Sequence, residues 1–142
     1  MGKKPLEIAG QKSVILDSRA VIAHLEDEPS AEKVETIMGE AHEAGIPLLM
    51  MVVNAGEVWY SVARRLSGRD ADQSIQDIID LGIRIVDADW NLTREAARFK
   101  QKGRIAYADC FAAALANREG SPLVTGDPEF KAVEDRVSIL WV

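Results

Sequence analysis

The chain has 142 residues, a length typical of one compact domain. Lysine and arginine number 17 and aspartate and glutamate 23, so the formal net charge is −6. That balance argues against a protein that binds nucleic acid over its whole surface, but it leaves room for a local basic patch. The single cysteine, Cys110, excludes an internal disulfide and a multi-cysteine zinc site, and it suits a reducing, cytoplasmic environment. Residues 1–12 lack the apolar stretch of a signal peptide, and the longest uncharged run, residues 44–56, is too short to span a membrane.

Short apolar runs rich in β-branched residues alternate along the chain with longer segments whose apolar residues recur at helical spacing. The short runs predict strands at residues 14–17, 47–53, 83–86, 122–125 and 137–142. The longer segments predict helices at residues 18–27, 30–45, 54–68, 70–82, 90–102 and 106–119. Side chains suited to an N-cap stand where several of these helices begin, namely Ser30, Asp70 and Asp89, and Gly45 and Gly68 mark helix ends.

This alternation predicts an α/β fold in which a central parallel sheet of five strands is flanked by helices on both faces. We expect a single domain over residues 13–142. An N-terminal extension, residues 1–12, precedes it, and both disorder and a partner contact are open for this segment. Ligands of such sheets bind outside the carboxyl ends of the strands, so the functional residues are expected there.

Four carboxylates stand alone in apolar surroundings, unlike the other acidic residues, which lie among further charges on solvated helix faces. Asp17 ends the first strand, and Glu57 follows the second. Asp109 is the only charge in the first turns of an alanine-rich helix, and Asp127 follows the fourth strand. A carboxylate beside a face that packs on a sheet is costly unless it has a partner or a task.

Each of these carboxylates also has a purely structural interpretation. Asp17 and Asp127 are each placed to cap a helix. Asn54 and Glu57 have the spacing of a capping box, with Asn54 as the N-cap. Asp109 could interact with the positive end of its helix. Considered one at a time, none of the four positions distinguishes a structural role from a role in binding a metal ion.

Taken together, the four carboxylates favour a metal site, because the predicted topology brings them to one edge of the sheet. Two unit charges about 4 Å apart repel by roughly 4 kcal/mol at an effective dielectric constant near 20. Several carboxylates at that range must take up protons or bind a cation. Ligand sets made only of oxygen suit Mg²⁺ or Mn²⁺.

At these four residues the sequence resembles the PIN-domain family of metal-dependent ribonucleases, and most of all the VapC toxins of bacterial and archaeal toxin–antitoxin pairs. The matching segments occur in the family order and at the family spacing: VILDSRAVIA, NAGEVWYSVARR, YADCFAAALA and LVTGDPEF. No single segment is specific, but the ordered set covers nearly all of the chain after residue 12.

The resemblance implies a PIN-like fold and an endoribonuclease that hydrolyses RNA phosphodiester bonds with one or two Mg²⁺ or Mn²⁺ ions. It also implies the role of toxin in a VapBC-type pair, with a VapB-type antitoxin as partner, RNA as substrate and a homodimer as assembly. The lack of a long uncharged run predicts no association with membranes. Carried over by position, it makes Asp17, Glu57, Asp109 and Asp127 the acidic metal site. Ser18 and Thr125 match hydroxyl residues of the family.

Arg19 departs from the family pattern, because such toxins usually carry a small polar or hydrophobic residue there, and this leaves the RNA specificity open. It joins a set of basic candidates for RNA contacts, whose alternative is a solvated helix end. The further members of that set are Arg64, Arg65, Arg69, Lys100, Lys102 and Arg104.

Two alternatives stay open at this point. The chain could be a non-catalytic PIN-like binding module whose acidic pocket engages a protein partner, a reading to which the net charge of −6 gives some weight. Trp59 and Tyr60 could lie in the core, on a dimer face or on a base-stacking platform, with the core or the dimer face favoured.

Overall fold

The computed structural model describes residues 8–142. Part of the expected N-terminal extension, residues 1–7, lies outside the described residues. Ile8, within the remainder of that extension, is buried in the core. The boundary between extension and domain therefore stays a prediction. Within residues 8–142, none of the helices has both the length and the apolar character that crossing a membrane requires.

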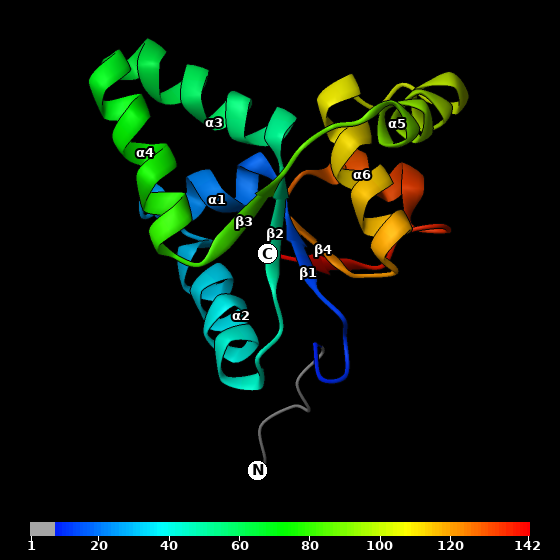
Figure 1. The fold of residues 1–142 in the computed structure, drawn as a ribbon, viewed down its shortest axis with the longest axis horizontal. Coiled ribbons are helices and arrows are strands. Elements are labelled where there is room, and N and C mark those ends of the chain that lie inside the picture. The colour runs from blue at the N-terminus through cyan, green and yellow to red at the C-terminus, as the bar shows by residue number, and fades with distance from the viewer. Residues whose placement is uncertain (1–7) are drawn as a thin grey trace.

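Parallel strands form the centre of the molecule, and helices connect them (Figure 1). The strands are β1 (Val14–Leu16), β2 (Leu48–Met51), β3 (Ile83–Val86), β4 (Leu123–Thr125) and β5 (Ile139–Trp141). The α-helices are α1 (Ser18–Leu25), α2 (Ala31–Ala44), α3 (Val52–Arg65), α4 (Gly68–Asp80), α5 (Trp90–Lys102) and α6 (Tyr107–Glu119). A 3₁₀ helix, η1 (Pro128–Val133), follows β4.

The sheet has five strands in the order β3-β2-β1-β4-β5, and all of its pairings are parallel. This confirms the predicted fold class. β1 lies in the middle of the sheet, with Val14 paired to Leu48 of β2 and Ile15 paired to Leu123 of β4. The chain leaves β1 toward β2 and later returns to its other side with β4, so the carboxyl end of β1 is a topological switch point. Asp17 lies directly at that point.

Helices cover both faces of the sheet, as predicted. One hydrophobic cluster joins one face to α1–α4, through residues such as Val34, Val58 and Ile78. The other joins the opposite face to α5, α6 and η1, through residues such as Phe99 and Phe130. Figure 1 shows these two groups of helices on either side of the strands. Each face of a parallel sheet must be covered in this way, because its strands are apolar on both sides.

The boundaries of two helices differ from the sequence-based prediction. α3 begins at Val52, so Asn54 is inside the helix and Met51 is the N-cap, without a side-chain hydrogen bond. The capping-box interpretation of Asn54 is therefore wrong. α4 is capped by Ser67, whose hydroxyl oxygen accepts a hydrogen bond from the backbone N–H of Asp70 at 3.1 Å. Asp70 is thus in the first turn of α4 and is not its cap.

Gly68 does not end α3, which stops at Arg65, but is the first residue of α4. Three other predicted helix-end positions agree with the structure. Asp89 caps α5 by accepting a hydrogen bond from the backbone N–H of Leu92 at 2.8 Å. Gly45 ends α2 with a φ of 68°, a left-handed conformation that favours glycine. Ser30 occupies the N-cap position of α2, although its side chain makes no capping hydrogen bond.

Of the positions left open for Trp59 and Tyr60, the core is excluded, because these side chains are 38% and 46% exposed. The indole N–H of Trp59 donates to Asp72 Oδ1 at 2.9 Å, and the guanidinium of Arg64 lies 4.9 Å from the centre of the Tyr60 ring. A role for these rings in a dimer or in base stacking stays a prediction.

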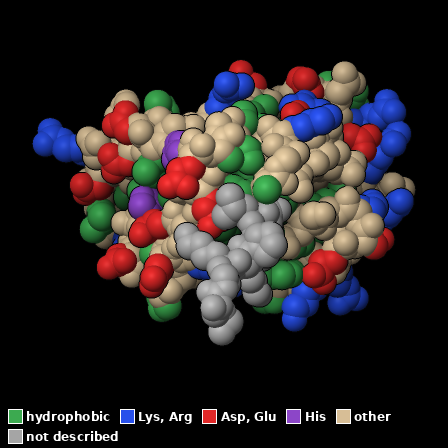
Figure 2. Space-filling view, turned by 90° about the horizontal axis from the view of Figure 1, so that it is seen from below, with side chains coloured by type: hydrophobic (Ala, Val, Ile, Leu, Met, Phe, Trp, Pro, Cys, Tyr) green, Lys and Arg blue, Asp and Glu red, His purple; other side chains and the backbone are tan. Residues whose placement is uncertain are grey.

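Charge is distributed unevenly over the surface. On the face that Figure 2 shows, acidic side chains and histidines gather on the left, on the side of α2 and α4. Lysine and arginine side chains gather on the right, on the side of α5 and α6. The net charge of −6 therefore conceals a local excess of positive charge.

Candidate metal centre at the carboxyl edge of the sheet

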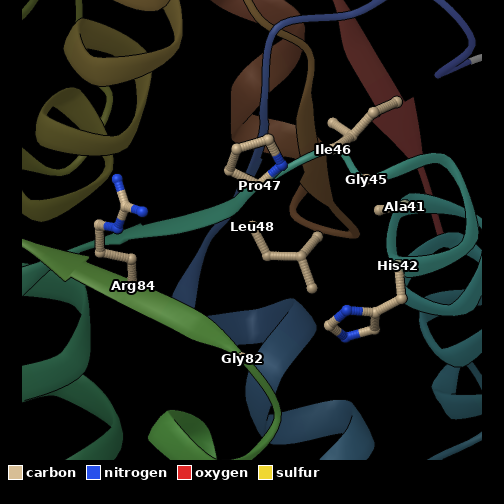
Figure 3. Close-up of a pocket in the computed structure, with 8 residues that line it drawn as sticks. All are labelled: Ala41, His42, Gly45, Ile46, Pro47, Leu48, Gly82 and Arg84. Carbon is tan, nitrogen blue, oxygen red and sulfur yellow. The ribbon is translucent and has the colours of Figure 1, made fainter.

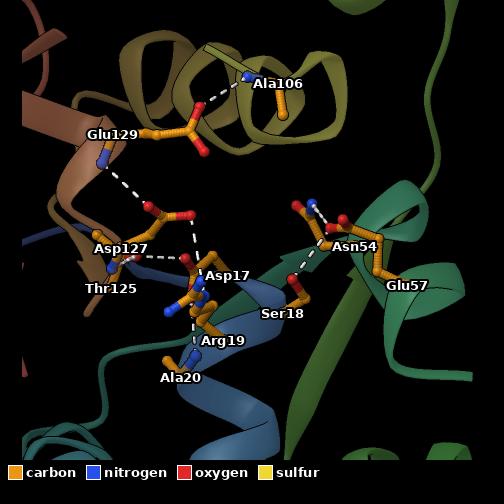
Figure 4. A network of polar contacts seen from close by, with 10 residues as sticks. All are labelled: Asp17, Ser18, Arg19, Ala20, Asn54, Glu57, Ala106, Thr125, Asp127 and Glu129. Carbon is orange, nitrogen blue, oxygen red and sulfur yellow. Dashed lines mark hydrogen bonds and ion pairs between the residues drawn. The ribbon is translucent and has the colours of Figure 1, made fainter. Parts of the chain in front are cut away.

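Asp17 lies between β1 and α1 and is held by hydrogen bonds from two sides (Figure 4). It is the N-cap of α1, and its Oδ1 accepts a hydrogen bond from the backbone N–H of Ala20 at 2.8 Å. Its Oδ2 accepts a hydrogen bond from the hydroxyl of Thr125. Asp17 is only 1% exposed, and this burial raises its pKa to about 7. The two hydrogen bonds oppose that rise, while the charges of Asp127 and Glu57 add to it.

Glu57 reaches the same edge from α3. Its Oε1 accepts hydrogen bonds from the Ser18 hydroxyl at 3.0 Å and from Asn54 Nδ2 at 2.9 Å. Ser18 follows Asp17 directly and is buried, so the first turn of α1 fixes both Asp17 and Glu57. The hydroxyl residues predicted beside the acidic site, Ser18 and Thr125, thus both contact its carboxylates.

Asp127 combines the structural and the chemical interpretation of the sequence. It caps η1 through Oδ1, which accepts a hydrogen bond from the backbone N–H of Glu129 at 3.0 Å. Its own backbone N–H donates to the Thr125 hydroxyl oxygen at 3.0 Å. Its Oδ2 lies 3.9 Å from Nε of Arg19. Oδ1 of Asp127 thus fixes the turn, and Oδ2 faces the positively charged guanidinium of Arg19.

Asp109 and Asp127 meet a third carboxylate, that of Glu129. One carboxylate oxygen from each of these residues lies within 4.8 Å of the other two. Asp109 is buried in the first turn of α6, and its pKa is raised to about 7, first by burial and then by the charges of Asp127, Glu57, Asp17 and Glu129. The five carboxylates therefore form one electrostatically connected group.

Sequence reasoning missed Glu129. The four predicted carboxylates stand alone in apolar sequence, whereas Glu129 lies in the charged stretch DPEFKAVED. A usable signal was its position two residues after Asp127, in the first turn of η1. Glu129 Oε1 also accepts a hydrogen bond from the backbone N–H of Ala106 at 3.3 Å, just before α6 (Figure 4). It therefore links η1 to the helix that carries Asp109.

The donor set fits a hard divalent cation. The candidate ligands at this edge are carboxylates, and among the described residues neither sulfur nor imidazole nitrogen joins them. Such sets suit Mg²⁺ and Mn²⁺ better than Zn²⁺. Burial is the largest cause of the raised pKa values of Asp17 and Asp109, and the neighbouring carboxylates add to it, so a bound cation would stabilise the ionised forms of both groups.

The basic residues predicted to contact RNA differ in their surroundings. The side chain of Arg19 is 65% exposed and contacts the carboxylate of Asp127. Among the described residues, no other member of that set forms an ion pair with the acidic group. Arg65 pairs with Glu26 at 2.7 Å, and Lys100 Nζ donates to the backbone oxygen of Ile105 at 3.0 Å, so both have structural partners. The remaining members are exposed: Arg64, Arg69, Lys102 and Arg104.

A separate pocket of about 250 Å³ lies near the amino ends of β2 and β3, away from the carboxylates (Figure 3). Its polar side chains are His42 and Arg84. His42 Nε2 makes a hydrogen bond of 2.9 Å with the backbone oxygen of Leu81, and its ring packs against Gly82, where a Cβ would approach to 2.9 Å. His42 thus joins α2 to the turn before β3, which is a structural role.

Comparisons with known proteins agree with this geometry. The sequence model of the PIN domain family matches residues 14–136. Ribonuclease VapC30 of Mycobacterium tuberculosis is 27% identical over 125 residues, which cover 83% of this chain and 92% of the relative.

Two solved structures share the fold at 15% sequence identity. One is VapBC2 from Rickettsia felis, bound to a DNA fragment from its promoter, with a TM-score of 0.73 over 89% of this chain and 96% of that chain. The other is VapC20 of Mycobacterium tuberculosis, a toxin that cleaves the sarcin–ricin loop, with a TM-score of 0.67 over 85% and 95%. The resemblance inferred from the four sequence segments is thereby confirmed, and the chain belongs to the PIN domain family.

Proposed function

We propose that the protein is a divalent-metal-dependent endoribonuclease that hydrolyses RNA phosphodiester bonds and acts as the toxin of a VapBC-type toxin–antitoxin pair. The observation that carries this proposal is the convergence of Asp17, Glu57, Asp109, Asp127 and Glu129 at one edge of the sheet. The names of the similar proteins, a ribonuclease and a toxin that cleaves RNA, support the same reaction.

The metal would be Mg²⁺ or Mn²⁺. Asp109, Asp127 and Glu129 have oxygens close enough to share one ion, and Asp17 and Glu57 complete the acidic set. Such an ion, when bound, lowers the pKa of a water molecule and stabilises negative charge on the phosphate. The protein's own contribution is to fix the ligands, because Thr125 holds Asp17 and Ser18 holds Glu57 before any substrate arrives.

Basic residues at the rim would hold the RNA backbone. Arg19 Nε lies 3.9 Å from Asp127 Oδ2. Lys102 is the last residue of α5, and Arg104 lies between α5 and α6, the helix that carries Asp109. Arg64 and Arg65 lie seven and eight residues beyond Glu57 along α3, roughly 10–12 Å at the rise of an α-helix, and Arg69 lies in the first turn of α4. They would therefore contact nucleotides further from the cleaved bond.

The partners follow from the same relatives. Several solved structures with this fold are toxin–antitoxin complexes, such as VapBC-1 from nontypeable Haemophilus influenzae. For the present chain we propose a cognate VapB-type antitoxin as partner. We also propose that the protein assembles as a homodimer and is located in the cytoplasm.

A non-catalytic binding module is the second candidate, and one contact favours it. Asp127 faces the guanidinium of Arg19, so the acidic group accommodates an arginine and could accommodate one from a protein partner. The two functions differ in their need for metal. A binding module would show no heat with Mn²⁺ and no thermal stabilisation by it.

RNA cleavage by the purified protein tests the proposal. Cleavage is expected with Mg²⁺ or Mn²⁺ and is expected to stop in excess EDTA. Asp17→Asn and Asp109→Asn should fold normally but should neither cleave RNA nor arrest growth when expressed. Undiminished cleavage by either variant, or in excess EDTA, would contradict the proposed function.

A further inference from the structure

Asn54 lies between Glu57 and the turn that carries Asp109, although the sequence pattern predicted it to be a helix cap. It is 0% exposed, and its Nδ2 donates two hydrogen bonds. One goes to Glu57 Oε1 at 2.9 Å and the other to the backbone oxygen of Ala108 at 3.1 Å. The first partner is one turn further along α3, and the second is in the first turn of α6, directly before Asp109. Asn54 therefore joins the two helices that carry Glu57 and Asp109.

The orientation of the Asn54 amide follows from its two partners. Both are acceptors, so the NH₂ group must face them and the oxygen must face away. Figure 4 shows the amide oxygen turned away from Glu57. This Oδ1 is buried and has no hydrogen-bond partner within the described chain. A buried acceptor without a donor destabilises a fold, so Asn54 is a poor choice for stability alone.

We propose that Asn54 is a positioning residue for the metal centre, which it serves by fixing the Glu57 carboxylate relative to the turn that carries Asp109. This inference rests on the proposed metal-dependent function. Glu57 Oε1 already accepts one hydrogen bond from Ser18, and the second from Asn54 fills its remaining lone-pair position. The other carboxylate oxygen, Oε2, is then the one that remains to bind a cation.

The contact with Ala108 gives Asn54 a role that Ser18 does not have. Ser18 ties Glu57 to α1 and Asp17, whereas Asn54 ties it to α6. Asp109 follows Ala108 directly, so a shift of α6 relative to α3 would separate Asp109 from Glu57. One amide thereby fixes the Glu57 carboxylate relative to the turn that carries Asp109, although the charges of these two groups repel.

Asn54→Leu separates positioning from stability, because leucine has nearly the same shape and removes the orphaned acceptor together with both donors. We expect the melting temperature of the metal-free protein to stay the same or rise. Mn²⁺ affinity measured by calorimetry should nevertheless fall about 10- to 100-fold, the usual effect of losing a group that orients a metal ligand. Ser74→Ala, which removes the buried hydroxyl of Ser74 from α4, is the control and should leave Mn²⁺ affinity unchanged.

A double-mutant comparison identifies the group through which Asn54 acts. In the Glu57→Gln background, Asn54→Leu should lose most of its effect on Mn²⁺ affinity, because the ligand that it positions is already altered. Wild-type affinity in Asn54→Leu, or a loss of affinity that merely follows a lower melting temperature, would overturn this inference and leave the proposed function standing. Absence of Mn²⁺ binding by the wild-type protein would overturn both.

Discussion

The hydroxyl of Thr125 donates a hydrogen bond to Asp17 Oδ2 and so ties the carboxyl end of β4 to the carboxyl end of β1. The same oxygen accepts the backbone N–H of Asp127, so one hydroxyl serves two carboxylate-bearing residues. Thr125 is 0% exposed, and water cannot replace it. Removing the Thr125 hydroxyl would therefore break two buried hydrogen bonds at once, and we expect this to lower the stability of the fold.

Thr125→Val keeps the shape of the side chain and removes its hydroxyl. Two buried polar groups then lose their partner, and we expect the free energy of unfolding to fall by about 1–3 kcal/mol. Urea unfolding of the metal-free protein measures the change. Thr36→Val is the control, because the Thr36 hydroxyl bonds the backbone oxygen of Glu32 on an exposed helix face. Its effect should stay within about 0.5 kcal/mol, and an equal effect of the two substitutions would contradict this assignment.

The stability of the metal-free protein should depend on pH in a direction set by Asp17 and Asp109. Burial raises the pKa of both groups from 3.8 to about 7, so the folded protein binds these protons more tightly than the unfolded chain. The free energy of unfolding should therefore fall as pH rises from about 4 to about 7 and change little from this cause above that range. Each unit of pKa difference corresponds to about 1.4 kcal/mol, so the effect is large enough to measure.

Asp17→Asn isolates the contribution of Asp17 to this pH dependence. Asparagine keeps an oxygen to accept the Ala20 N–H, and it carries no ionisable proton. Its advantage in melting temperature over the wild-type protein should be smaller at pH 5 and grow toward pH 8. A difference in melting temperature between the two proteins that stays constant from pH 5 to pH 8 would show that the pKa of Asp17 is not raised by folding. Mn²⁺ should stabilise the wild-type protein most at the alkaline end, where both carboxylates are ionised.

Glu129→Gln tests whether Glu129 belongs to the metal site. The substitution removes one of the three carboxylates whose oxygens lie within 4.8 Å of one another, and it keeps an oxygen to accept the Ala106 N–H. Mn²⁺ affinity should fall by about tenfold or more, or about 1.4 kcal/mol. The metal-free protein should become more stable, because a repelling charge is lost. Asp135→Asn removes an exposed charge just beyond η1 and should change neither quantity.

The sequence alone was sufficient for the fold class and for four of the five clustered carboxylates, because both depend on local patterns. Apolar strands such as Ile83–Val86 are readable by composition, and Asp17 and Asp127 follow strands directly. Glu129 was not readable, because its neighbours are charged and only the fold of η1 brings it to Asp109. The start of α3 was missed because Val52 and Val53 are β-branched and continue the apolar run of β2, a pattern that favours a strand. That error also hid the contact of Asn54 with α6, which joins residues 54 positions apart in sequence.

Arg19 supplies the last prediction, because it is the basic residue in contact with the acidic group and the departure from the family pattern. Its Nε lies 3.9 Å from Asp127 Oδ2 at an exposed position, where such a pair contributes about 0–1 kcal/mol. Arg19→Ala should therefore raise Mn²⁺ affinity by no more than about fivefold.

The same substitution should weaken RNA binding, because a guanidinium at the mouth of the site is placed to meet a phosphate once a cation occupies Asp127. Binding is best measured in the inactive Asp17→Asn background over a series of KCl concentrations, with Arg118→Ala as the control. Arg118 lies at the opposite end of α6, where it pairs with Glu119. We expect the slope of log affinity against log salt to become shallower by up to about one for Arg19→Ala and to stay the same for Arg118→Ala. Equal slopes for the two variants would show that Arg19 does not contact an RNA phosphate and pairs only with Asp127. A shallower slope for Arg19→Ala alone would show that Arg19 binds a phosphate of the substrate beside the acidic site.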